Sequence, residues 1–166
     1  MSTYTGKILV TGASGQLGAL AIAALLKKVP ASQLIATARD PSKLADLAAR
    51  GVEVRQADYT QPASLEAAFQ GVDRLLLISS SEVGQRLPQH RNAIEAAKRA
   101  GVKLLAYTSI LRPDTSPLGL ADEHVATEAL LRESGLPTVL LRNGWYTENY
   151  LASAPVALQH GAGLGS

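Results

Sequence analysis

The sequence predicts an α/β fold in which a doubly wound parallel sheet is covered by helices on both faces. The first observation is a glycine-rich run, Gly12–Gly18, which follows the apolar run Ile8–Val10 and opens a stretch with helical spacing. The second is the strict alternation of short apolar runs with longer helical runs as far as Arg142. A glycine turn after the first strand favours the strand order 3-2-1-4-5-6, which is the Rossmann-type arrangement.

Six runs are predicted to be strands because they are rich in Leu, Ile, Val and Ala and are bounded by Gly, Pro or charged residues. In chain order they are Lys7–Val10, Leu34–Ala38, Val52–Ala57, Asp73–Ile78, Lys103–Thr108 and Thr138–Arg142. The fourth run is continuously apolar over Leu75–Ile78, which indicates a strand that is buried on both faces.

Five helices are predicted between these strands, at Gln16–Lys28, Ser42–Arg50, Ala63–Gln70, Pro88–Ala100 and Ala121–Glu133. Asp40 and Pro41 have the residue types of an N-cap and a first helical position. Glycines close most of the helices, as expected of residues just past a helix end. We therefore expect residues 1–150 to form one NAD(P)-binding domain and residues 151–166 to form a short, flexible C-terminal tail.

Composition narrows the class of protein further. The 166 residues contain no cysteine, which excludes disulfides, thiol catalysis and thiolate metal sites, and no metal is expected. The 16 basic and 14 acidic residues are not clustered, so no nucleic-acid partner is expected. No apolar run approaches a membrane span and the first strand begins too early for a signal peptide, so we expect a cytoplasmic protein without a membrane partner. The apolar run 151–158 leaves a homo-oligomer open.

The glycine run predicts a phosphate-binding turn. Gly12 permits a tight turn out of the strand, Gly15 leaves room for a pyrophosphate, and Gly18 lets the helix pack close to the strand. Backbone N–H groups and the helix dipole then hold the phosphates. The predicted cradle consists of Gly12, Ala13, Ser14, Gly15, Gln16 and Leu17. A glycine-rich turn that binds nothing is the alternative.

Ligands of an open parallel sheet bind at the carboxyl ends of its strands, so the residues directly after the strands are candidates. Arg39 offers a forked cation to a 2′-phosphate, which favours NADP over NAD, or else it is an ordinary surface arginine. Asp58 accepts a hydrogen bond from adenine or, equally, caps a turn. Three small residues after the fourth strand, which either adjoin the nicotinamide ribose or form a simple turn, are Ser79, Ser80 and Ser81.

The last strand is followed by an unusual density of polar and aromatic residues. They are Asn143, Gly144, Trp145, Tyr146, Thr147 and Glu148, and they include the only tryptophan of the chain. Such a run at a strand end is typical of a wall along a nicotinamide or a substrate. A structural turn is the alternative.

The dehydrogenase pair Tyr-x-x-x-Lys is missing. At the start of the helix predicted after the fifth strand, where this pair would be expected, Leu120 stands at the tyrosine position and His124 at the lysine position. His124 is therefore a candidate to orient a ribose or a substrate, and an ordinary surface histidine is the alternative. The sequence has no Ser-His-Asp arrangement with supporting context, so it does not indicate a hydrolase. No lysine follows the glycines in the manner of a phosphate-binding loop, so it does not indicate a phosphoryl-transfer enzyme.

Five runs together resemble the NmrA-like group of atypical short-chain dehydrogenases/reductases, and within it the bacterial NADPH-dependent quinone oxidoreductases. The runs are Thr11–Gly18, Leu76–Arg86, Ala106–Ser109, Thr115–His124 and Leu141–Tyr150. The resemblance covers nearly the whole chain. It implies an NADP(H) site built from Gly12–Leu17, Arg39, Ser79–Ser81 and Asn143–Glu148. It also implies two-electron hydride transfer to a quinone, which can be protonated from solvent without a catalytic tyrosine.

The chain departs from that pattern at its C-terminus. Members of the group have a smaller second domain that closes the substrate cleft, and we expect it to be missing here. NADP(H) binding is then retained while quinone reduction is impaired, because an open site buries little of an apolar substrate. The alternative is an NADP(H)-binding module with a redox-sensing or regulatory role and no turnover.

Overall fold

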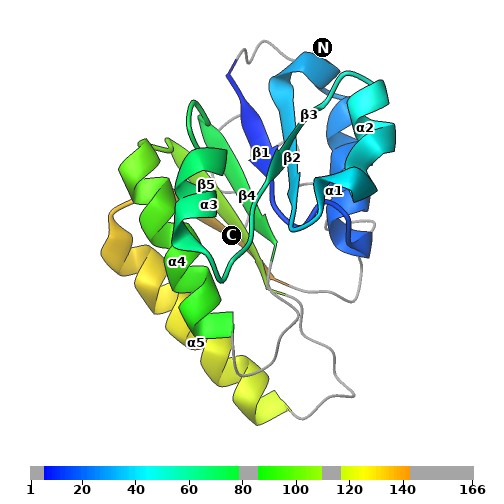
Figure 1. The fold of residues 1–166 in the computed structure, drawn as a ribbon. Coiled ribbons are helices and arrows are strands. Elements are labelled where there is room, and N and C mark those ends of the chain that lie inside the picture. Colours follow the sequence, from blue (N-terminus) through cyan, green and yellow to red (C-terminus); the bar gives the residue numbers. More distant parts are fainter. Residues whose placement is uncertain (1–5, 79–85, 110–116, 143–166) are drawn as a thin grey trace.

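The structure is a computed structural model that describes residues 6–78, 86–109 and 117–142 (Figure 1). Within these ranges one sheet has the strand order β3-β2-β1-β4-β5-β6, and all neighbouring strands run parallel. The strands are β1 (Ile8–Val10), β2 (Leu34–Ala38), β3 (Glu53–Gln56), β4 (Arg74–Ile78), β5 (Leu104–Ser109) and β6 (Thr138–Arg142). The predicted fold class and strand order are confirmed.

The helices form one layer on each side of the sheet. They are α1 (Gln16–Leu26), α2 (Ala45–Ala49), α3 (Pro62–Ala68), α4 (Arg86–Ala100) and α5 (Pro117–Ser134), with short 3-10 helices η1 (Ala31–Gln33) and η2 (Pro41–Leu44). Figure 1 shows α1 and α2 on one face and α3, α4 and α5 on the other. The chain adds strands in one direction from β1 to β3 and then, from β4 to β6, in the opposite direction. Because crossovers between parallel strands are right-handed, this reversal places the helices of the two halves on opposite faces of the sheet.

The core consists of two apolar layers that share the sheet. Ile8 and Val10 point towards α1 and pack in one cluster with Ile22. Leu9, between them, points to the opposite face and packs in a second cluster with Leu65 of α3 and Ala93 of α4. Because both faces are covered, the central strands carry continuous apolar runs rather than an alternation of polar and apolar residues.

The ends of α1, α3 and α4 lie within two residues of the prediction, and the helix boundaries differ more in two other places. Asp40 is the predicted N-cap, and its Oδ1 accepts a hydrogen bond from the N–H of Ser42 at 3.1 Å. The single helix predicted after it forms as η2 followed by α2, because Leu44 leaves the helical region (φ −107°, ψ 18°) and is buried in the core. Helix α5 also begins earlier than predicted, at Pro117, a residue type that suits a first helical turn.

Two glycines shape the turn between β1 and α1. Gly12 has a φ of +61°, which residues with a side chain rarely adopt. Gly18 lies against the turn so closely that a Cβ there would sit 2.1 Å from the Gly12 carbonyl oxygen. The two roles predicted from the spacing, tight turn and close helix packing, are therefore confirmed.

Gly18→Ala tests the closeness of this packing. The added methyl group must displace backbone rather than a flexible side chain, so we expect the free energy of unfolding to fall by about 2–3 kcal/mol in urea denaturation. Gly15→Ala is the matched control in the same turn, because its Cβ would meet nothing closer than 3.4 Å. The control should lose about 1 kcal/mol or less. Equal losses in the two variants would contradict the steric account.

Candidate nucleotide-binding site

The start of α1 presents backbone donors at the carboxyl end of the sheet. Gly15 is the N-cap, and no described side chain caps the helix there. Two backbone hydrogen bonds close the turn. The N–H of Gly15 donates to the carbonyl oxygen of Gly12 at 3.0 Å, and the N–H of Ala19 donates to the carbonyl oxygen of Gly15 at 2.9 Å. The N–H groups of Gln16 and Leu17 precede the first intrahelical bonds, so they are donors for an anion.

Gly15 has no conformational reason to be a glycine. Its backbone is extended, with φ −82° and ψ 170°, which any residue adopts. Its missing Cβ would meet only the Gly12 carbonyl oxygen, at an ordinary contact distance of 3.4 Å. Gly12 and Gly18 are required by the chain itself, whereas the open space beside Gly15 is what a pyrophosphate lying on the helix terminus requires.

The other residues of the predicted cradle divide into anchors and exposed positions. Ala13 is buried, and its N–H donates to the carbonyl oxygen of Thr37 at 2.9 Å, which ties the turn to β2. Ser14, Gly15 and Gln16 are exposed and Leu17 is half-buried. The surface open to a ligand therefore runs from Ser14 to Gln16, with Ala13 holding it in place.

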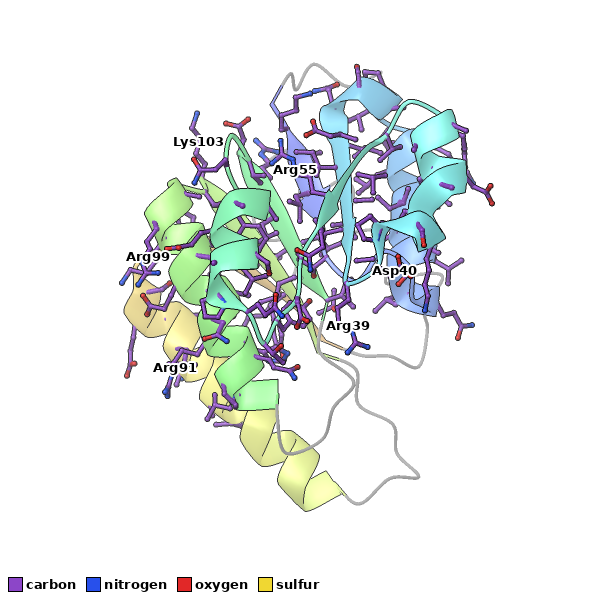
Figure 2. The ribbon with its side chains drawn as sticks, viewed as in Figure 1. Arg39, Asp40, Arg55, Arg91, Arg99 and Lys103 are labelled. Carbon is purple, nitrogen blue, oxygen red and sulfur yellow. The ribbon has the colours of Figure 1, made fainter. Side chains whose placement is uncertain are left out.

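Arg39 and Asp40 leave the end of β2 in different directions. Figure 2 shows the guanidinium of Arg39 projecting past the ends of the strands, while Asp40 lies beside η2. The Asp40 carboxylate accepts hydrogen bonds from the hydroxyl of Ser42 at 2.7 Å and from its N–H at 3.1 Å. These bonds, with the charge of Lys43, hold the pKa of Asp40 below its usual range. Asp40 is thus committed to capping, and Arg39, directly after β2, is the residue whose side chain extends towards the candidate site.

Asp58 lies at the end of β3 and forms a turn with Thr60. Its Oδ1 accepts hydrogen bonds from the Thr60 hydroxyl at 2.7 Å and the Thr60 N–H at 2.8 Å. The hydroxyl first, then the N–H and the positive charge of Arg39, lower the pKa of Asp58, so the carboxylate is ionised. The turn role that the sequence left open is therefore present. A bond from Asp58 to adenine stays a prediction.

A cluster of hydroxyls beside the glycine turn was not predicted. The Tyr59 hydroxyl lies 2.7 Å from both Thr11 Oγ1 and the carbonyl oxygen of Ile78, and can donate to either. The Ile78 N–H donates in turn to Thr11 Oγ1 at 2.9 Å. Burial raises the pKa of Tyr59 well above its ordinary value, so its hydroxyl is neutral. The ends of β1 and β4 are thus joined through one tyrosine from the loop after β3.

The same tyrosine contacts α4, which covers one face of the sheet. Its ring meets His90 of α4 edge to face, and His90 meets Tyr107 of β5 in the same way. His90 Nδ1 lies 2.9 Å from the hydroxyl of Thr127 on α5. The periodicity of α4 could have predicted that His90 is buried, because it shares a face with Ala93, Ile94 and Ala97. Its partners could not have been predicted.

Several predicted site residues cannot be placed. Ser79, Ser80 and Ser81 after β4, and the run from Asn143 to Glu148 after β6, lie outside the described residues. His124 belongs to α5, and its side chain also lies outside what the structure describes. Of the remaining candidates, the structure brings the glycine turn, Arg39 and Asp58 to one edge of the sheet, as the parallel order requires.

A family model described as NAD(P)H-binding matches residues 12–165, which is most of the chain. The chain belongs to this family. The match begins at Gly12, the first residue of the glycine turn, and the predicted resemblance and cofactor class are confirmed.

Relatives agree with this assignment. The chain is 64% identical over 159 residues to quinone oxidoreductase 2 of Escherichia coli, and 36% identical over 152 residues to an NmrA-like family domain-containing oxidoreductase of Aspergillus flavus. A crystal structure of the Escherichia coli NADPH-dependent quinone oxidoreductase with NADPH matches with a TM-score of 0.77 at 66% identity, over 93% of this chain and 54% of that one. A Citrobacter triphenylmethane reductase with NADP(H) matches with a TM-score of 0.79 at 46% identity, over 87% and 51%.

This family member spans about half the length of the curated relatives it matches. It covers 56% of the Escherichia coli quinone oxidoreductase 2 and 49% of the Aspergillus protein, with 96% and 87% of its own residues. In the described ranges no helix combines the length and apolar character that crossing a membrane needs. Nor do three His, Asp or Glu side chains gather there as metal ligands.

Gly15→Val tests the turn as a dinucleotide site. The branched side chain occupies the space beside the helix terminus and should weaken NADPH binding at least ~100-fold, since two or more charge-assisted hydrogen bonds are lost. Fluorescence titration of NADPH measures the affinity, and circular dichroism checks the fold. Ala23→Val, at an exposed position of the same helix, is the control and should bind normally. A folded Gly15→Val protein with unchanged affinity would rule out this site.

Proposed function

We propose that this chain is the cofactor-binding part of an NADPH-dependent oxidoreductase that reduces quinones by direct two-electron hydride transfer. The observation that carries the proposal is the 64% identity to quinone oxidoreductase 2 over 96% of the chain. A residue-level site for the cofactor supports it independently, because the glycine turn and Arg39 lie at the sheet edge where dinucleotides bind.

The residues at this edge suit NADPH better than NADH. A carboxylate at the end of β2 would accept hydrogen bonds from the 2′-hydroxyl of NADH, but Asp40 already accepts two bonds from Ser42. Arg39 instead offers a planar cation that can bind a 2′-phosphate through two hydrogen bonds. The N–H groups of Gln16 and Leu17 would hold the pyrophosphate. Asp58 is proposed to lie beside the adenine.

Hydride transfer to a quinone does not require a general acid or base from the protein. When bound, NADPH would supply a hydride, and a quinone that accepts it would need one further proton, from water, to become a hydroquinone. The chain then has to hold the cofactor still and to expose one face of it. We propose that Ser79–Ser81 and Asn143–Glu148 line the nicotinamide side and that His124 orients a ribose or the substrate.

The remaining parts of the proposal concern the whole protein. We place residues 1–150 in the cofactor-binding domain and residues 151–166 in a tail, and we place the protein in the cytoplasm. The apolar run 151–158 supports self-association. Light scattering during size-exclusion chromatography measures the mass and tests it directly.

Arg39→Ala tests the choice of cofactor. The substitution should reduce the preference for NADPH over NADH by roughly 10- to 100-fold, because charge-assisted bonds of about 1.5–3 kcal/mol are lost. NADH affinity should stay nearly constant, since NADH has no 2′-phosphate. Arg50→Ala, which removes the same charge from the end of α2, should leave the preference unchanged. If the preference survives in Arg39→Ala, another residue recognises the phosphate.

Turnover per bound NADPH tests the enzymatic proposal. We expect this chain to bind NADPH but to oxidise it slowly with a simple quinone, because it covers only 56% of quinone oxidoreductase 2 and the remaining part of such a protein would help to enclose the substrate and position the nicotinamide. A chimera that adds the C-terminal part of Escherichia coli quinone oxidoreductase 2 should turn over faster. Equal turnover would show that the present chain is sufficient. NADPH binding with no turnover in either protein would favour a regulatory module instead.

A further inference from the structure

We propose that Tyr59 is a positioning residue that sets the separation between the two phosphate subsites of the cofactor. One is the glycine turn, which receives the pyrophosphate, and the other surrounds Arg39, which receives the 2′-phosphate. The inference rests on the proposed binding of NADPH. It adds a role for a residue that is not itself proposed to bind either phosphate.

On the glycine-turn side, Tyr59 fixes the stem from which the turn leaves β1. Its hydroxyl lies 2.7 Å from Thr11 Oγ1, and Thr11 directly precedes Gly12. Thr11 is also held by its N–H, which donates to the Leu76 carbonyl oxygen at 3.1 Å. The second contact of the Tyr59 hydroxyl, with the Ile78 carbonyl oxygen, ties the same point to the end of β4. The turn therefore starts from a stem with little freedom to shift.

On the adenosine side, the backbone around Tyr59 is fixed to the strand that carries Arg39. The N–H of Ala57 donates to the carbonyl oxygen of Ala38 at 3.0 Å, and Ala38 directly precedes Arg39. Asp58 is held by its N–H on Ser64 Oγ, at 2.9 Å. The carbonyl oxygen of Tyr59 accepts a hydrogen bond from Asn92 Nδ2 at 2.8 Å. The backbone end of Tyr59 thus belongs to one subsite and its hydroxyl to the other.

This arrangement makes Tyr59 a strut between the two subsites. A dinucleotide contacts both at once, so its affinity depends on their being the right distance apart before it binds. A mononucleotide that occupies only the subsite around Arg39 does not sense that distance. Loss of the hydroxyl should therefore weaken ligands that span both subsites and spare ligands that use one.

Tyr59→Phe removes the two hydroxyl contacts of Tyr59 and keeps its ring. The ring keeps its edge-to-face contact with His90, whose centroid lies 6.3 Å away, so the side chain stays in place. The probes are NADPH, which spans both subsites, and adenosine 2′-phosphate, which uses Arg39. Titration calorimetry should show NADPH affinity falling about 3- to 10-fold, the range expected from one lost hydrogen bond. The affinity for adenosine 2′-phosphate should change less than about twofold.

Thr11→Val removes the same contact from its other end and gives a second route to the answer. It should produce the same selective loss. The losses of NADPH affinity in the two single variants should add only in part in the double variant, because both remove the Tyr59–Thr11 contact while each also removes a separate contact with Ile78. Phe69→Leu, in the same core layer but outside this cluster, controls for general destabilisation. It should leave the ratio of the two affinities unchanged even where it lowers the free energy of unfolding.

The outcomes separate the inference from the function on which it rests. A wild-type chain that does not bind NADPH refutes the proposed function and the strut with it. A wild-type chain that binds, with an unchanged affinity ratio in Tyr59→Phe, refutes the strut alone. Parallel losses for both probes, or a shift of the ratio in Phe69→Leu, also overturn it, since either would reflect a general loss of structure.

Discussion

The contact between Gly18 and the carbonyl of Gly12 is the constraint on which the rest of the site depends. No side chain separates the first turn of α1 from the backbone that leaves β1. The helix therefore begins immediately at the carboxyl end of the sheet, with its first N–H groups and the positive end of its dipole directed at the candidate ligand. A helix displaced by even one methyl group would leave those donors in another place.

The parallel sheet explains why the remaining parts of the site converge on the same edge. All strands start at one edge of the sheet and end at the other, so the residues that follow β1, β2 and β3 are neighbours. They are nevertheless far apart in sequence, 27 positions from Gly12 to Arg39 and 19 from Arg39 to Asp58. Gly12, Arg39 and Asp58 come together in this way. The helices cover both faces, which leaves the strand ends as the place where backbone and polar side chains meet solvent or a ligand.

Polar side chains buried beneath this edge are hydrogen-bonded, which is the condition for placing them there at all. Thr11 accepts a hydrogen bond from a backbone N–H, Tyr59 bonds across two strands, and His90 meets Thr127. Such a cluster stabilises one arrangement of the strand ends over others, because any shift leaves a buried polar group unpaired. A binding site that must match a rigid dinucleotide benefits from this kind of order.

The sequence by itself determined the features that depend on spacing along the chain. The alternation of elements, the roles of Gly12 and Gly18 and the capping by Asp40 are local, and each follows from conformational preference or period. The strand order was predicted because a glycine turn after the first strand is typical of the Rossmann-type arrangement. The predicted bounds of η2, α2 and α5 were less accurate than those of the other helices. Leu44 is buried in the core and divides the helix predicted after Asp40, and α5 begins at Pro117, before the periodic apolar pattern starts.

Only the tertiary structure decided which distant side chains meet. Tyr59 reaches Thr11 across 48 positions of sequence, Thr11 bonds to Ile78 across 67, and His90 meets Thr127 across 37. No residue type or spacing encodes these pairs. They depend on the register of the strands and on how far each helix is displaced along the sheet, and these are set by packing of the whole core rather than by any one segment.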